Sequence, residues 1–359
     1  MSRIEGNIEQ IETPALLVDL DILEENIHKM ESYLKDKKAK LRPHFKTHKC
    51  TEIAKMQLAA GAKGITCAKL SEAEVLAAAG IEDILIANQV VDTQKLHRLA
   101  KLALSRKITV SVDNPLNIDD ISHAAQECGS TIYVLIEINI GMERCGINTG
   151  EEAFLLADKI QNSPGLVFEG IQAYAGQISH EADHTARSRG VAEAVEKVAG
   201  IKAYLTEKGI NVKEISGAST GTYNITGDNT IWTEIQAGSY VFMDTDYERL
   251  DLGFENALSV LTTVMHKRNG AAVTDAGQKV CCITKGLPVI KGYPDLKVKS
   301  LNEEHGKIID EKNVLTYLQK IEYIPSHCCS TVNLHDRLYG IRKGVIEKVL
   351  LIDGRGKSQ

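Results

Sequence analysis

The sequence predicts an α/β fold, a (β/α)8 barrel of the TIM type with a second, β-rich domain. Short apolar runs rich in β-branched residues alternate with amphipathic helical patterns through the first two thirds of the chain. No Gly-x-Gly-x-x-Gly follows the first strand, which argues against an open, doubly wound sheet. After about residue 250 the helical patterns give way to short strands joined by Gly, Pro and Asn.

The regular structure is expected to begin with a strand at 13–20, where Pro14 opens an apolar run. A helix follows, with apolar residues at helical spacing from Ile22 to Leu34 and Asp21 placed to cap it. The eight strands expected in the barrel are 40–47, 64–69, 83–88, 108–113, 132–140, 167–174, 213–216 and 233–238. The helices expected between them include 51–60, 71–79, 94–105, 118–128, 151–162 and 184–208.

The domain boundary is predicted at residue 250. The barrel would occupy 21–250, and the β-rich domain would occupy 251–359 together with the strand at 13–20. The short strands expected in this second domain are 257–266, 271–275, 278–284, 296–300, 306–310, 320–324 and 349–352.

The composition limits which binding partners and which cellular compartment are expected. The chain has 359 residues, 43% of them hydrophobic and 25% charged, and a formal net charge of −6 without a long basic run. The charge pattern therefore does not indicate nucleic acid or a membrane as a binding partner. The first residues lack the apolar core of a signal peptide, and the eight cysteines are scattered rather than arranged as a disulfide framework. We expect a cytoplasmic protein with reduced thiols.

The stretch 42–49 (Arg-Pro-His-Phe-Lys-Thr-His-Lys) surrounds Lys46 with cationic or titratable side chains. A further positive charge there would be costly in a closed site, which would favour the neutral amine that forms a Schiff base. Taken alone, the stretch is equally well interpreted as a basic surface loop.

Small residues and hydroxyls follow the last two barrel strands, at 216–222 and 236–240. In such barrels these loops lie at the mouth, where backbone N–H groups and hydroxyls can bind a phosphate. A flexible turn is the alternative interpretation. With a Schiff-base lysine at the end of the first strand, the two features together would meet the needs of pyridoxal 5′-phosphate.

His327 and Cys329 form a His-x-Cys pair. On a strand, residues i and i+2 point to the same side, so the pair could share one metal ion while Cys328 faces elsewhere. A buried histidine beside packed thiols is the alternative.

The chain resembles the fold-type III pyridoxal-phosphate enzymes, the alanine-racemase-like barrels, and within them the branch of D-threonine aldolases and metal-dependent D-serine dehydratases. The resemblance covers almost the full length. Its motifs are Pro43-His-Phe-Lys46-Thr-His-Lys49, Gly141-x-x-Arg144-x-Gly146, Ser216-Gly-x-Ser-Thr-Gly-Thr222, Tyr240-x-x-x-Asp244 and Pro325-Ser-His327-Cys-Cys329.

The resemblance implies a role for each matching residue. Lys46 would hold the cofactor as a Schiff base, Arg144 would hydrogen-bond its phenolic oxygen, and Tyr174 would line the ring pocket. A core aromatic and an interface ion pair are the plainer interpretations of Tyr174 and Arg144. The residues implied to bind phosphate are Ser219, Thr220, Gly221, Gly238 and Tyr240. His327 and Cys329 would bind a divalent metal, for which the thiolate favours zinc over manganese or magnesium. A homodimer is also implied.

We therefore expect a lyase acting on D-amino acids that carry a β-hydroxyl group, by aldolase cleavage or by dehydration and deamination. No arginine occurs between Arg189 and Arg249, so the arginine that holds the pyridine nitrogen in alanine racemases has no counterpart there. A fold-type III racemase and a non-catalytic cofactor carrier are the alternatives. The second base stays unassigned, with His180 and His184 as loose candidates.

Overall fold

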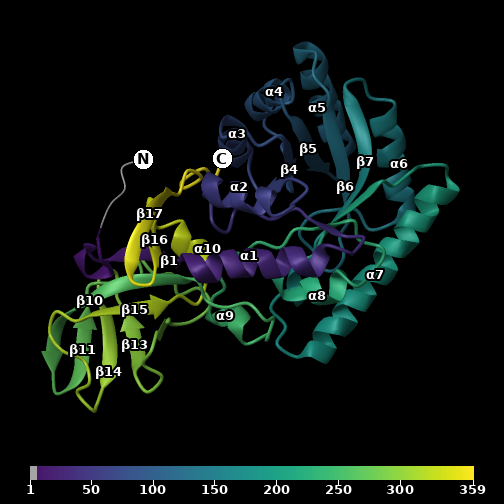
Figure 1. Cartoon of the computed structure of the whole chain (residues 1–359). Coiled ribbons are helices and arrows are strands. Elements are labelled where there is room, and N and C mark those ends of the chain that lie inside the picture. Colours follow the sequence, from purple (N-terminus) through teal and green to yellow (C-terminus); the bar gives the residue numbers. More distant parts are fainter. Residues whose placement is uncertain (1–5) are drawn as a thin grey trace. The chain divides into compact units, whose positions relative to one another are not determined.

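The computed structural model describes residues 6–359 and divides them into two compact units (Figure 1). The barrel unit comprises residues 31–46, 53–238 and 357–359. The β unit comprises residues 6–30, 47–52 and 239–356. Among the described residues, no helix is long and apolar enough to cross a bilayer.

Eight parallel strands form the sheet of the barrel unit, in the order β2-β9-β8-β7-β6-β5-β4-β3. The two edges meet where His44 forms a parallel bridge with Thr66, and the Phe45 N–H donates to the Thr66 carbonyl at 2.7 Å. This parallel sheet, with a separate β-rich unit, confirms the predicted fold class. The strands are β2 (Lys40–Leu41), β3 (Ile65–Cys67), β4 (Asp83–Ile86), β5 (Lys107–Val112), β6 (Ile132–Glu137), β7 (Leu166–Ala173), β8 (Glu214–Gly217) and β9 (Glu234–Ile235).

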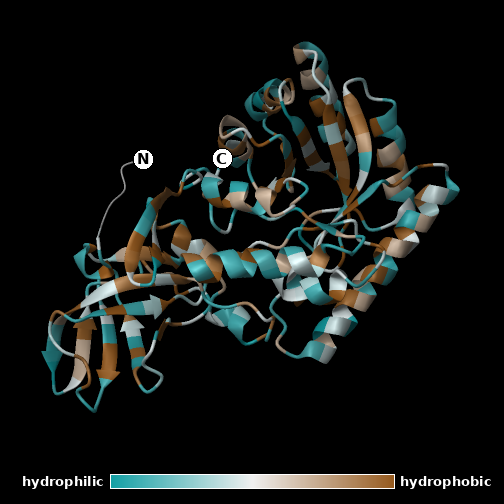
Figure 2. Cartoon of the chain, viewed as in Figure 1, coloured by the Kyte–Doolittle hydropathy of each residue, from teal (hydrophilic) through white to brown (hydrophobic). Residues whose placement is uncertain are grey.

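In the barrel unit, helices follow the strands as the alternating pattern predicts, and the apolar faces of the helices between residues 53 and 207 join the strands in one core (Figure 2). Helix α1 begins at Leu20, and Asp19 accepts a hydrogen bond from the Ile22 N–H at 3.2 Å, so the prediction of Asp21 as the cap is wrong. The helices are α1 (Leu20–Leu34), α2 (Thr51–Ala59), α3 (Leu70–Ala78), α4 (Thr93–Leu102), α5 (Pro115–Cys128), α6 (Gly150–Gln161), α7 (His184–Glu207), α8 (Tyr223–Thr226), α9 (Thr245–Glu248) and α10 (Cys328–Val332). Single 3₁₀ turns are η1 (Ile8–Gln10), η2 (Gly176–Ile178), η3 (Thr220–Thr222) and η4 (Ser239–Val241).

The β unit contains a nine-stranded sheet in which β1 lies between β10 (antiparallel) and β16 (parallel). The expected strand at 278–284 is absent, because the N–H groups of Val280 and Cys281 turn back to the Gly277 carbonyl. The strands are β1 (Ala15–Asp19), β10 (Leu258–Arg268), β11 (Gly270–Thr274), β12 (Val289–Ile290), β13 (Lys297–Leu301), β14 (Gly306–Asp310), β15 (Lys320–Ile324), β16 (Arg337–Arg342) and β17 (Val345–Leu351).

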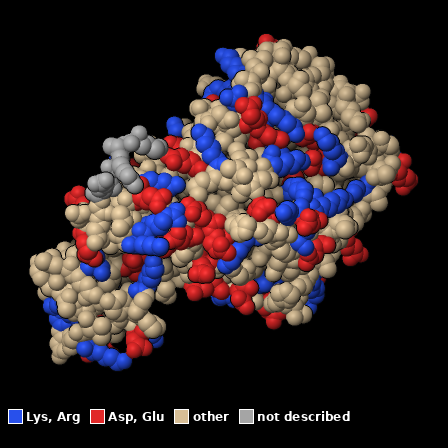
Figure 3. All heavy atoms as spheres, viewed as in Figure 1, with Lys and Arg blue, Asp and Glu red and all other residues tan. Residues whose placement is uncertain are grey.

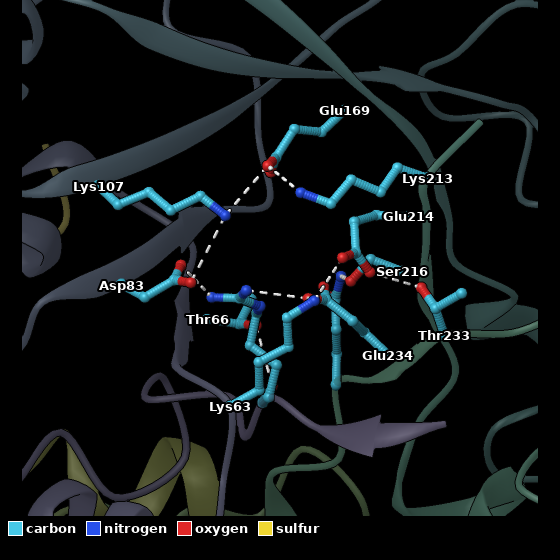
Figure 4. Close-up of polar contacts among 12 residues, drawn as sticks. Lys63, Thr66, Asp83, Lys107, Glu169, Lys213, Glu214, Ser216, Thr233 and Glu234 are labelled. Carbon is cyan, nitrogen blue, oxygen red and sulfur yellow. Dashed lines mark hydrogen bonds and ion pairs between the residues drawn. The ribbon is translucent and has the colours of Figure 1, made fainter. Parts of the chain in front are cut away.

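Acidic and basic side chains are interspersed on the molecular face in Figure 3, as expected for a chain without a long basic run. A more ordered arrangement of charge lies inside the barrel unit, near the amino-terminal ends of its strands (Figure 4). Four basic and four acidic side chains alternate in this ion network. Its ion pairs are Arg42–Asp83 (2.7 Å), Arg42–Glu234 (2.9 Å), Lys63–Glu234 (2.8 Å), Lys63–Glu214 (2.5 Å), Lys107–Asp83 (3.6 Å), Lys107–Glu169 (3.1 Å) and Lys213–Glu169 (3.6 Å).

We expect this network to make the stability of the fold sensitive to acid. Despite the opposing effect of burial, Arg42 and Lys63 lower the pKa of Glu234 from 4.5 to about 2. A carboxylate with a lowered pKa contributes fully above pH 4.5, and its contribution, on the order of 3 kcal/mol, is lost as the pH falls towards 2. The free energy of unfolding from urea titrations between pH 6 and pH 3 should fall more steeply for the unmodified chain than for Glu234→Gln. Equal slopes would contradict this prediction.

Candidate active site

Lys46 is the single exposed residue in the stretch 41–50; its neighbours in that stretch are all buried. The backbone before it is fixed on both sides, since the His44 N–H donates to the Ala237 carbonyl at 3.1 Å and the Phe45 N–H donates to Thr66. The segment leaves the carboxyl end of β2, the end at which barrels of this kind carry their chemistry. The fold therefore presents one primary amine to solvent from a buried, hydrogen-bonded segment.

Tyr174 brings two of the other predicted residues together. The Lys46 Nζ lies 5.7 Å from the centroid of the Tyr174 ring, and the Arg144 Cζ lies 5.8 Å from the same centroid. Tyr174 is half-buried and directly follows β7. An amine and a guanidinium thus flank one aromatic ring in the barrel unit, within the range of cation–π contacts.

The loop after β6 carries Arg144 and is held by Asn139, which is buried. The Asn139 Oδ1 accepts from the N–H groups of Gly141 and Glu143, both at 3.1 Å, and its Nδ2 donates to the Glu143 carboxylate at 2.7 Å. The Arg144 Nη2 lies 3.8 Å from Glu137 of the same unit. Burial raises the pKa of Glu137, although hydrogen bonding and Arg144 oppose the rise.

The predicted phosphate-binding residues Ser219, Thr220 and Gly221 lie in the turn between β8 and α8, and all three are buried. The Ser219 hydroxyl lies 3.3 Å from that of Thr222. A Cβ added to Gly221 would lie 1.9 Å from the Ser179 carbonyl oxygen, so this backbone approach requires glycine. Gly238 is buried and follows β9, the neighbour of β8 in the sheet.

These residues fit pyridoxal phosphate. The Lys46 ammonium forms no ion pair with a carboxylate of residues 6–359, so its amine is not held by an acidic partner. Hydroxyls and glycine at 219–221 are the groups that accommodate a phosphate at close range. The Arg144 guanidinium supplies hydrogen-bond donors for an oxyanion.

Tyr240 belongs to the β unit, where it is fully buried and packs on Phe254 with the ring centroids 5.6 Å apart. Asp244 follows in the same segment and accepts hydrogen bonds from the N–H groups of Cys328 and Tyr247, at 2.8 and 3.0 Å. Asp244 thereby anchors the start of α10, the helix that carries Cys329.

His327 and Cys329 lie close together in the β unit, but the expected strand geometry is wrong. His327 is the residue before α10, with an extended backbone (φ −149°, ψ 98°), and Cys329 lies in the first turn of that helix. Because this short helix begins between them, the side chains approach across the helix start and share a hydrogen bond.

Two hydroxyls orient the His327 ring. The Thr284 Oγ1 lies 2.9 Å and the Ser330 Oγ 3.1 Å from the His327 Nδ1. With Nδ1 engaged, the remaining ring nitrogen is the one suited to bind a metal. Thr284 precedes His327 by 43 positions and belongs to no motif of the sequence, so sequence reasoning missed it.

The surroundings of Cys329 lower the pKa of its thiol. Hydrogen bonds, first from Cys328 and then from His327, lower the pKa of Cys329, while burial raises the pKa of Cys328. The hydroxyls of Thr47 and Ser239 lie 3.3 and 3.6 Å from the Cys329 sulfur. A cysteine sulfur beside an imidazole offers the two donors of a two-residue metal site, which fits a divalent ion with open positions. No cluster of three or more His, Cys, Asp or Glu residues suited to a metal occurs within 6–359.

The two candidate bases lie near the start of α7. His180 follows η2 and is half-buried, and His184 is the exposed first residue of α7, 3.5 Å from the Ser188 hydroxyl through its Nδ1. The positions of these two histidines do not identify either of them as the second catalytic base.

Comparisons with known proteins match both parts of the chain. Residues 18–246 match the family described as alanine racemase, N-terminal domain, and residues 257–341 match the putative serine dehydratase domain. A D-threonine aldolase of Arthrobacter sp. is 40% identical, covering 98% of this chain and 94% of that protein. A 3-hydroxy-D-aspartate aldolase of Paracoccus denitrificans is 39% identical, covering 97% of this chain and 93% of that protein. The crystal structure of D-threonine aldolase from Filomicrobium marinum is similar with a TM-score of 0.97 and 38% identity, covering all of both chains.

Proposed function

The chain belongs to the alanine racemase N-terminal domain family, and on that premise we propose that it is a pyridoxal-phosphate-dependent lyase acting on D-amino acids with a β-hydroxyl group. The observation that carries the proposal is the exposed Lys46 amine beside Tyr174 and Arg144. The carboxyl end of a barrel strand is where a cofactor-linked lysine is expected in this fold.

The residues of the barrel unit bind the cofactor and orient it. Lys46 holds the cofactor covalently through its amine, Tyr174 lines the ring pocket, and Arg144 donates to the phenolic oxygen. Of the residues that the resemblance implies for the phosphate, the barrel unit holds Ser219, Thr220, Gly221 and Gly238, and the β unit holds Tyr240. When bound, pyridoxal phosphate withdraws electrons from the α-carbon of the attached amino acid. The Lys46 amine would be the group that accepts or returns a proton at that carbon.

We propose that His327 and Cys329 bind one divalent metal, with zinc favoured over manganese or magnesium because thiolate is a soft ligand. A metal with open positions supplies Lewis-acid activation of a substrate hydroxyl. His327 is oriented by Thr284, and Cys329 by Cys328 and Thr47, the residue that follows Lys46 in the chain.

Aldolase cleavage is the first candidate outcome, because the two relatives at about 40% identity are both named aldolases. D-threonine would then give glycine and acetaldehyde. Dehydration is the second candidate, supported by the match of residues 257–341 to the putative serine dehydratase domain. D-serine would then give pyruvate and ammonia through loss of the hydroxyl and the α-proton.

The direct test incubates the chain, loaded with pyridoxal phosphate and with zinc or manganese, separately with D-threonine and D-serine. Acetaldehyde, glycine, keto acid and ammonia are measured, with L-threonine as the stereochemical control. We expect acetaldehyde and glycine in equal amounts from D-threonine. If no D-amino acid with a β-hydroxyl is turned over under either metal, the lyase proposal is wrong, and interconversion of D- and L-alanine would support the racemase alternative.

We also propose a cytoplasmic homodimer, as the family resemblance implies. Light scattering of the cofactor-loaded protein should give twice the chain mass of 39.3 kDa. A mass of one chain across micromolar concentrations would contradict the dimer.

Replacing Thr284 by valine should weaken metal binding without unfolding the β unit. The hydroxyl at 2.9 Å from the His327 Nδ1 is lost, while the shape of the side chain is kept. Loss of such an orienting partner typically costs about 10- to 100-fold in metal affinity. Competition with a chromogenic chelator measures the effect, and Thr316→Val, at an exposed position of the same unit, is the matched control. Equal affinities in the two variants would show that Thr284 does not orient the ligand.

A further inference from the structure

The barrel closes at β2, the strand that leads to Lys46. Backbone hydrogen bonds hold residues 40–45 on both sides, to residues 233–237 next to β9 and to residues 63–66 at β3, although the paired strands are short. Strand β2 pairs with β9 at two positions, Lys40 with Glu234 and Leu41 with Ile235. On its other side the chain meets β3 through the single bridge of His44 with Thr66. By comparison, β6 and β7 pair at six positions. The strand ladder at this seam is therefore short, and the backbone hydrogen bonds continue past it on both sides of residues 40–45.

The Arg42 side chain supplies a second connection across this seam. Arg42 is 2% exposed, and its guanidinium contacts Asp83 at the start of β4 and Glu234 at the start of β9. One side chain thus joins strands on both sides of β2. The Arg42 carbonyl also accepts from the Thr66 hydroxyl at 2.9 Å.

The chain leaves room for this guanidinium at Gly64. A Cβ added to Gly64 would lie 2.4 Å from the Arg42 Nη1 and 2.6 Å from the Asp83 carbonyl oxygen. The backbone conformation of Gly64 is one that other residues also adopt. Glycine is needed at this position only because a side chain would not fit. Any larger residue must displace the ion pair or the start of β4.

The remainder of the network neutralises the acidic partners of Arg42. Lys63 also contacts Glu234, and Lys107 also contacts Asp83 (Figure 4). Each carboxylate therefore lies between two cations. A buried arginine paired in this way is costly to disrupt, because removing one partner leaves the others uncompensated.

We propose that Arg42 is a positioning residue for Lys46: its ion pairs across the closing seam fix the short segment that carries the cofactor-binding amine. Between the two residues lie Pro43, which restricts the backbone, and His44 and Phe45, whose N–H groups are bound to the neighbouring strands. This segment transmits a displacement at Arg42 to Lys46. The inference rests on the proposed role of Lys46, but the order of the segment can be measured without the cofactor.

The test compares Arg42→Lys and Gly64→Ala with Lys213→Met in the full chain. Gly64→Ala keeps every charge and places a Cβ against the Arg42 guanidinium and the Asp83 carbonyl oxygen, so it disturbs the ion pair at the start of β4. Lys213 is an outer member of the network, 64% exposed, and serves as the matched control. Hydrogen–deuterium exchange of residues 43–48 is measured in cofactor-free protein, and the affinity for pyridoxal phosphate and the pH dependence of its visible band are measured after loading.

We expect Arg42→Lys and Gly64→Ala to raise exchange at 43–48 at least about tenfold while Lys213→Met does not. Cofactor affinity should fall about tenfold in the same two variants, since a small misplacement of a reacting group is costly. Unchanged exchange at 43–48 in both variants would overturn the proposal, even if their melting temperatures fall. If the unmodified chain shows no visible band, the proposed function fails, and the exchange result alone still decides whether Arg42 orders the segment.

Discussion

Replacing Lys46 by alanine should abolish the visible absorption band of bound pyridoxal phosphate and reduce turnover of D-threonine by about a thousandfold or more. The cofactor can then bind only through its phosphate and ring contacts, and the amine proposed to transfer the α-proton is missing. Because the side chain is exposed at the end of β2, its removal creates no cavity, and the melting temperature of the cofactor-free protein should stay close to that of the unmodified chain.

Two controls sharpen this result. Lys55→Ala removes another exposed lysine, from α2, and should leave the band and the activity intact. Reduction of the loaded protein with borohydride, followed by peptide mapping, should place the cofactor on the peptide that contains Lys46. A band that survives in Lys46→Ala, or a label on a different lysine, would refute the assignment.

Much of the barrel could be predicted because its signals are local. Each strand is a short apolar run and each helix an amphipathic one, so the order of elements follows from patterns within about ten residues. The strands of the β unit were predicted less well. The segment 278–284 has the composition of a strand, yet its N–H groups close turns on Gly277. Strand β16 (Arg337–Arg342) was not among the expected strands.

The parts of the candidate site that sequence reasoning missed depend on contacts between distant segments. Arg42 belongs to the basic stretch 42–49, whereas Asp83 and Glu234 look like ordinary polar residues at strand starts. Only closure of the barrel brings their charges together. Thr284 contacts His327 because the turn that replaces the expected strand carries its hydroxyl to the imidazole. The motif at 325–329 predicted that His327 and Cys329 lie close together but attributed this to a strand, whereas a helix start produces it.

Replacing His327 by alanine should lower the affinity for divalent metal by more than about 100-fold, since loss of a ligand exceeds the effect of losing an orienting partner. Turnover should fall with it, and added zinc should not restore activity at concentrations that saturate the unmodified chain. The visible band of pyridoxal phosphate should persist, because Lys46 is intact. Metal content after dialysis, together with activity across a zinc titration, measures the effect.

Cys329→Asp offers the matched variant, since it keeps an anionic ligand and changes only its softness. Thiolate favours zinc, whereas carboxylate favours manganese or magnesium, so the variant should lose affinity for zinc relative to manganese while keeping a bound metal. His327→Ala lacks a ligand altogether and should bind both ions poorly. If His327→Ala keeps metal and activity, the ion binds elsewhere; if Cys329→Asp shows the same preference as the unmodified chain, the sulfur is not a ligand. The lowered pKa of Cys329 in the cofactor-free chain would then reflect only its hydrogen bonds to Cys328 and His327.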